Sequence, residues 1–230
     1  MPGMKIFAIL AVAVALLAGG ADAATRSTSS SDTVTVQGTG TVTAVPDEAS
    51  FSFTVQTKAT TAAAALARNG TATKAVIAAV ESAGVPEADI QTAQVSLDPV
   101  ESSDGTSIVA YTASDTITVT KLAVAKAGAI VDAAVGAGAT DVSGPSLDLS
   151  DQDALYAQAL KAAVAQAKTK AQVLAAAAGR SLGNVVSIVE GSGPTPVPFA
   201  VGGAASAPNT PIEAGTQEVQ ATVTIAYALG

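Results

Sequence analysis

Hydrophobic and polar side chains alternate along several segments of the chain. In residues 49–56, Ala49, Phe51, Phe53 and Val55 fall on one side and polar residues on the other, which is the pattern of a half-buried strand. Related patterns predict further strands at residues 33–43, 90–100, 111–121, 141–149, 185–190 and 218–229. The first two strands are close enough in sequence to pair as a hairpin.

Turn residues add two details to this strand pattern. Asp104-Gly105 lies between the strands predicted at 90–100 and 111–121, and this dipeptide is a strong hairpin signal. Gly144-Pro145 interrupts the strand at 141–149, and proline places that strand at a sheet edge because it lacks an N–H donor.

Three other segments repeat apolar residues at helical spacing and are each followed by glycine, a common helix stop. They span residues 61–83, 122–135 and 150–178. We predict that Ser150 caps the third helix, with Asp153 three residues on in a variant of the capping box. The predicted apolar stripe of this helix is Leu160, Ala163, Ala167, Ala171, Leu174 and Ala178. The order of elements predicts an α+β fold, with one or more antiparallel sheets and three main helices packed on one face.

The first 23 residues have the pattern of an export signal. Lys5 precedes an apolar run at residues 6–17, and Ala21-Asp22-Ala23 resembles a cleavage site,. The run is shorter than the roughly 20 residues of a membrane-spanning helix. We therefore expect cleavage near Ala23, no transmembrane span, and a periplasmic, extracellular or cell-envelope location. After the signal we expect a disordered tail over residues 24–32 and then a single domain over residues 33–230.

The amino-acid composition limits the kinds of chemistry that the protein can perform. The chain has no histidine and no cysteine, which excludes imidazole bases, thiolate nucleophiles, disulfides and the usual zinc sites. The net charge of −8 argues against a nucleic-acid partner,. We therefore predict that the protein is not an enzyme and needs no cofactor. Paired carboxylates remain available, so a carboxylate-based hydrolase such as a glycosidase stays as a minor alternative.

Three groups of residues are candidate sites, and each has a simpler structural interpretation. Asp148, Asp151 and Asp153 could bind Ca²⁺ through oxygen ligands, or could complement the dipole of a helix N-terminus. Gly38 and Gly40 do not complete a dinucleotide-binding motif and predict a backbone bulge or a close backbone crossing, of which the bulge is favoured. The third group comprises Lys161, Lys168 and Lys170. These lysines could bind an anion or a partner, or could lie on a solvated helix face.

The segment 191–215 is a long loop rich in proline and glycine. Connections of this length are usually functional or disordered, and several prolines favour extended backbone. Phe199 and Val201 are apolar but have no evident core to join. We therefore regard Pro196, Pro198, Phe199 and Val201 as candidate contacts between protomers.

Several motifs occur in the same order as in one known family. Residues 36–55, VQGTGTVTAVPDEASFSFTV, resemble the opening strand pair of the SIMPL-domain family, also called YggE-like. The similarity continues through Gly84-Val85, Asp89-Ile90-Gln91-Thr92, the turn at 136–139, Leu149-Ser150-Asp151, and Leu182-Gly183-Asn184-Val185. It covers nearly all of residues 34–229.

This resemblance implies an exported α+β protein of the periplasm or the outer membrane. Some relatives form large ring- or channel-like homo-oligomers, and family roles are described as stress protection, notably oxidative, and as surface antigens. The resemblance supplies no catalytic residues. The leading hypothesis is thus a non-enzymatic, self-associating envelope protein, and the alternative is a module that binds a cell-wall or small extracytoplasmic ligand of unknown identity.

Overall fold

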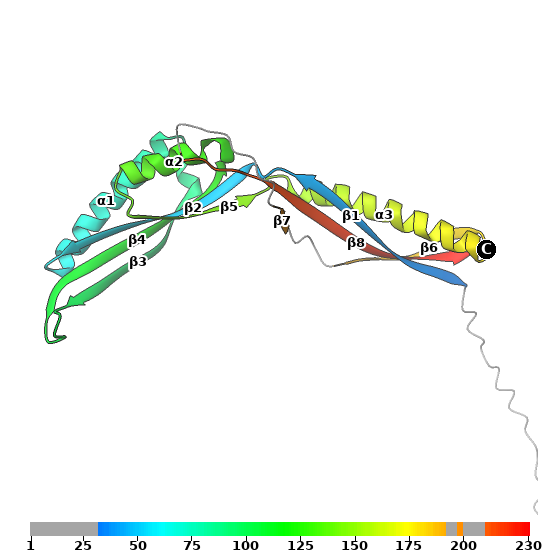
Figure 1. The fold of residues 1–230 in the computed structure, drawn as a ribbon, viewed down its shortest axis with the longest axis horizontal. Coiled ribbons are helices and arrows are strands. Elements are labelled where there is room, and N and C mark those ends of the chain that lie inside the picture. The colour runs from blue at the N-terminus through cyan, green and yellow to red at the C-terminus, as the bar shows by residue number, and fades with distance from the viewer. Residues whose placement is uncertain (1–31, 192–196, 200–209) are drawn as a thin grey trace, which may run out of the picture. The chain divides into compact units, whose positions relative to one another are not determined.

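The computed structural model describes residues 32–191, 197–199 and 210–230 (Figure 1). Residues Asp32–Gly230 form one compact unit. The predicted signal peptide and its cleavage site lie outside the described residues, as does the predicted tail except for Asp32.

The structure confirms the α+β class, with two antiparallel sheets and three α-helices in the part of the chain that it describes. The α-helices are α1 (Ala62–Ser82), α2 (Val124–Gly136) and α3 (Gln152–Ala177), and η1 (Glu87–Asp89) is a short 3₁₀ turn. The strands are β1 (Thr33–Ala44), β2 (Glu48–Ala59), β3 (Ile90–Glu101), β4 (Ile108–Ala123), β5 (Asp141–Asp148), β6 (Leu182–Glu190), β7 (Val197–Phe199) and β8 (Thr216–Leu229).

The first two strands do not pair with each other, so the predicted hairpin is wrong. In the first sheet the order is β1-β8-β6, with β7 also paired to β8, and in the second it is β3-β4-β2-β5. The chain changes sheets at Asp47, whose N–H donates to the carbonyl of Asp148 at 3.2 Å and whose carbonyl accepts from the N–H of Val124 at 3.1 Å. These bonds hold the start of β2 against β4 and β5.

The sheet of β2–β5 buries large side chains beneath α1 and α2. Phe53 and Ile117 are fully buried, and the rings of Phe51 and Phe53 stack with centroids 6.0 Å apart. Asn69 of α1 is also buried, and its amide donates to the carbonyls of Val55 at 2.7 Å and Ala113 at 3.3 Å. The amide thus satisfies two buried acceptors while the surrounding aliphatic residues exclude water.

The sheet of β1, β8 and β6 packs against α3 by close approach of the two backbones. A Cβ atom on Gly40 would lie 2.0 Å from the carbonyl oxygen of Ala159, and one on Gly38 would lie 2.0 Å from that of Ala163. The pairing of β1 with β8 is continuous from Thr33 to Ala44. The favoured prediction of a bulge is therefore wrong, and the alternative, a close backbone crossing, is confirmed, because these glycines make room for the helix.

The buried stripe of α3 is correspondingly narrow. It is made of alanines at every fourth position: Ala159, Ala163, Ala167, Ala171 and Ala175. Three of these were predicted, but Leu174 is 50% exposed and Ala178 is exposed as well. Because the helix lies so close to β1, α3 contributes only methyl side chains to the buried seam, and the larger Leu174 lies outside it.

Candidate interaction surfaces

The predicted acidic cluster lies where β5 leads into α3. Asp148 ends β5, Asp151 occupies the N-cap position of α3 without a side-chain capping bond, and Asp153 lies in the first helical turn. Among the described residues, no three histidine, cysteine, aspartate or glutamate side chains are grouped to hold a metal ion. The described structure therefore does not assemble the calcium site considered from the sequence.

Ser150 does not cap α3 as predicted, because it binds Asp47 instead. Its N–H donates to Oδ1 of Asp47 at 2.9 Å, and its hydroxyl donates to Oδ2. These hydrogen bonds from the Ser150 hydroxyl and N–H lower the pKa of Asp47 below its usual value, since they stabilise the ionised carboxylate,. Asp47 thus ties the beginning of α3 to the point where the chain changes sheets.

The two outer strands beside β8 differ in how their free edges are covered. On β1, the side-chain oxygen of Gln166 accepts from the N–H of Thr39 at 2.9 Å, and the amine of Lys170 donates to the carbonyl of Gln37 at 3.0 Å. Both side chains come from α3. An uncovered strand edge can pair with another chain, and here the middle of β1 is covered by polar side chains.

The strand on the other side of β8 is apolar and exposed. The exposed fractions of Val185, Val186, Ile188 and Val189 in β6 are 48%, 56%, 55% and 61%. The helix α3 packs mainly on β1 and β8, so it leaves this strand open. A hydrogen bond of 2.7 Å from the Tyr156 hydroxyl to Glu190 joins the end of β6 to α3 and raises the pKa of Tyr156, since the neighbouring carboxylate holds its proton.

The short strand β7 lies on the same side of β8 as β6. It pairs with residues 216–218 of β8, whereas β6 pairs with residues 223–229, and β1 occupies the opposite side. We call Leu182–Glu190 and Val197–Phe199 together the β6–β7 edge. The segment 191–215, which was predicted as loop throughout, therefore contributes a strand to this edge.

The predicted protomer contacts are only partly described. Pro198 and Phe199 belong to β7, opposite Gln217 and Thr216 of β8, whereas Pro196 and Val201 lie outside the described residues. The exposed apolar surface of β6 was not predicted from the sequence. The sequence feature that could have identified it is VVSIV at residues 185–189, where apolar and polar residues do not alternate. A strand that is apolar on both faces needs to be covered on both faces.

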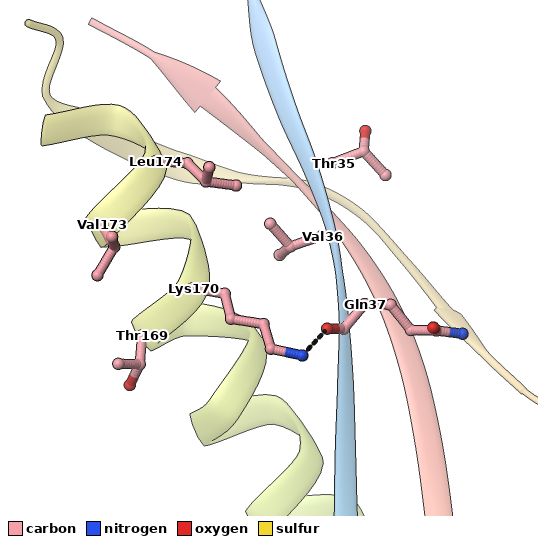
Figure 2. Close-up of a pocket in the computed structure, with 7 residues that line it drawn as sticks. All are labelled: Thr35, Val36, Gln37, Thr169, Lys170, Val173 and Leu174. Atoms are coloured by element: carbon pink, nitrogen blue, oxygen red, sulfur yellow. Dashed lines mark hydrogen bonds between the residues drawn. The ribbon is translucent and has the colours of Figure 1, made fainter. Parts of the chain in front are cut away.

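An open groove of about 520 Å³ runs between β1 and α3. In Figure 2, Val36 of β1 and Leu174 of α3 point into the space between the strand and the helix, and Lys170 crosses it to reach the carbonyl of Gln37. The other lining residues are Thr35, Gln37, Thr169 and Val173. The groove therefore combines apolar side walls, a strand edge and one cation.

Comparison with known proteins places this fold in a family. The SIMPL family model, described as a protein of unknown function (DUF541), matches residues 34–227. The chain belongs to the SIMPL family. This confirms the resemblance recognised in the sequence motifs.

Two SIMPL relatives have printed names that give a location. Each is a "26 kDa periplasmic immunogenic protein", one from Brucella melitensis biotype 1 and one from Brucella abortus. Each is 32% identical to this chain over 198 residues, which cover 80% of this chain and 79% of the relative. Separately, none of the helices that the structure describes is long and apolar enough to cross a membrane.

Proposed function

We propose that this SIMPL protein is an exported, non-enzymatic component of the cell envelope that self-associates through its β6–β7 edge. The observation that carries the proposal is the group of four half-exposed valine and isoleucine side chains on β6. These side chains leave both faces of the strand apolar and exposed, and exposed apolar surface of this kind marks interaction sites in soluble proteins.

A second copy of the chain fits this edge in both chemistry and charge. Residues 182–189 contain no charged side chain, and only Glu190 ends the strand with a charge. If two β6 strands pair antiparallel around Val186 or Ser187, the two glutamates lie at opposite ends, so like charges do not face each other. Such a pair is a two-fold contact that uses the same patch on both copies.

The covered edge of β1 supports the choice of β6. Gln166 and Lys170 already occupy the outward backbone groups of Thr39 and Gln37, so a second copy meets competition there. We include Pro196, Pro198, Phe199 and Val201 in the proposed interface because β7 continues the line of β6 along β8.

Export is supported by the signal-like first 23 residues, and by the periplasmic names of the two relatives. The non-enzymatic role is supported by the residue types available, since the sequence contains no histidine or cysteine. A link to stress protection rests on the family resemblance. Direct scavenging of peroxide is disfavoured because the only two methionines, Met1 and Met4, lie in the predicted signal,.

The proposed interface is tested by placing a charge at its centre. We expect the protein without residues 1–23 to form an assembly of defined mass in light scattering across concentration. Val186→Lys should reduce that mass, since two lysines would meet without partners, and deletion of residues 195–210 should reduce it as well. Val95→Lys is the matched control, because Val95 is 58% exposed on a strand of the other sheet. A strictly monomeric parent protein, or an unchanged mass for Val186→Lys, would refute the interface.

A further inference from the structure

The groove between β1 and α3 has walls that suit an apolar side chain. Val36 forms its base and is only 5% exposed, whereas Leu174 and Val173 on the helix side are 50% and 64% exposed. Covering the exposed parts of these side chains removes apolar surface from water, which favours an apolar ligand.

The strand wall of the groove offers backbone hydrogen-bonding groups. In an antiparallel pair, alternate residues direct both N–H and C=O away from the partner strand. The bonds made by Gln37 and Thr39 to α3 show that these residues of β1 direct them away from β8, so Thr35 does the same. Among the described residues no side chain hydrogen-bonds to the backbone of Thr35. This part of the edge can therefore accept a short additional strand.

The groove is closed at one end by side chains of α3. Lys170 and Gln166 cross to the edge of β1 at Gln37 and Thr39. A strand that follows β1 from Thr35 meets these side chains and cannot continue along the edge. The ligand must therefore end there or turn away.

The closed end carries a positive charge. Lys170 is the one charged residue among the seven that line the groove. Its amine has three donors and gives one to the carbonyl of Gln37,, so donors remain for an anion. A ligand strand parallel to β1 has its C-terminus at this end, and the net charge of −8 on the chain makes most of the remaining surface unfavourable for a carboxylate.

We propose that this groove binds the C-terminal end of an extended apolar peptide, which adds to β1 as a short strand and places its terminal carboxylate beside Lys170. Backbone pairing at Thr35 would hold the strand, and Val36, Val173 and Leu174 would contact its apolar side chains. The charge-assisted hydrogen bond to Lys170 would select a chain end over an internal segment. This binding role is separate from self-association at the β6–β7 edge, because the two strands lie on opposite sides of β8.

The test uses one peptide in two forms. A fluorescein-labelled five-residue peptide of alternating threonine and valine that ends in leucine is prepared with a free carboxylate and with a C-terminal amide. Fluorescence anisotropy with the protein lacking residues 1–23 should give at least about tenfold tighter binding for the free carboxylate, the effect of one charge-assisted hydrogen bond. Equal affinity for the two forms, or no binding of either, would overturn the proposal.

Three variants assign the effect to the groove. Lys170→Met should abolish the preference for the carboxylate, whereas Lys168→Met, which changes an exposed lysine outside the groove on the same helix, should retain it. Leu174→Ser should weaken both peptides equally. Because all three side chains are exposed, their replacement leaves the buried core unchanged, and the unfolding midpoint checks this. A loss of preference in Lys168→Met as large as in Lys170→Met would contradict the site.

Discussion

The two layers of this protein are packed by different means. Beneath α1 and α2, the sheet of β2–β5 is filled by large side chains such as Phe53 and Ile117, which are fully buried. On α3 the buried residues are all alanines, and at Gly38 and Gly40 of β1 the two backbones come so close that a Cβ atom would not fit. The first layer depends on the volume of its side chains, and the second depends on the absence of a side chain at these two glycines.

This difference determines which substitutions each layer tolerates. Removing volume from the aromatic layer leaves a cavity, with a cost that grows with the size of the cavity. Adding volume to the glycine–alanine seam forces the backbones apart, because interiors are close-packed and have few voids. The two layers should therefore be most sensitive to opposite changes in side-chain volume.

The largest expected effect is a cavity in the aromatic layer. Phe53→Ala should lower the free energy of unfolding by about 3–5 kcal/mol, the usual cost of truncating a buried phenylalanine, as measured by denaturant titration. Leu66→Ala is the control, since Leu66 is 42% exposed on α1 and should lose less than about 1 kcal/mol. A loss below about 1 kcal/mol for Phe53→Ala would show that the layer does not depend on this ring.

The next effect comes from one added methyl group in the seam. Gly40→Ala places a Cβ 2.0 Å from the carbonyl oxygen of Ala159 and should cost about 3 kcal/mol, the upper part of the range for overpacking. Gly70→Ala is the matched control in α1, where the added Cβ meets nothing within 4 Å. It should stabilise the protein by about 0.5–1 kcal/mol through helix propensity. If both substitutions shifted the unfolding midpoint in the same direction, the proposed contrast would fail.

The smallest effect concerns the link between the layers. Because the folded pKa of Asp47 is lowered by Ser150, its carboxylate stabilises the folded state above the ordinary aspartate pKa of about 4. This contribution is lost as the pH falls through that value and through the lower folded pKa. Asp47→Asn should remove this part of the acid dependence, which is measured as the free energy of unfolding between about pH 2 and pH 7. An identical pH dependence in the variant would exclude the link.

Local sequence patterns predicted the helices, strands and turns better than they predicted which strands pair with each other. Asp104-Gly105 correctly predicted a hairpin, since β3 and β4 pair antiparallel and Gly105 has a φ of 70°. Gly144-Pro145 correctly placed β5 at a sheet edge. Both features depend on a few neighbouring residues, whose backbone preferences are visible in the sequence.

Pairing between strands that are far apart in the sequence could not be predicted from local patterns. The first two strands were predicted to pair because they are adjacent in sequence, whereas β1 pairs with β8, which begins at Thr216. Likewise, Ser150 has the residue type of a helix cap, but its partner Asp47 lies 103 residues away. Strands that are adjacent in sequence are the most common partners, but not the only ones. A single sequence does not show directly when a strand pairs with a distant one instead.

The exposed strand β6 and the groove between β1 and α3 were not predicted from the sequence, for a related reason. The sequence identifies Lys170 as one of three helix lysines and residues 185–190 as a strand, but it does not say which of them α3 leaves exposed. That depends on how closely α3 approaches β1, which is set by Gly38 and Gly40. The predicted contacts Pro198 and Phe199 lie in β7, on the same side of β8 as β6.

The pairing of β1 with β8 also sets a condition on when this protein can fold. Because β8 (Thr216–Leu229) is the central strand of its sheet, neither β1 nor β6 has its partner until residues 216–229 have been synthesised. Throughout that interval the glycine-containing strand remains open to other chains. The layer of β2–β5 is complete by Asp148, so it can form first and fold while the remainder of the chain is still emerging.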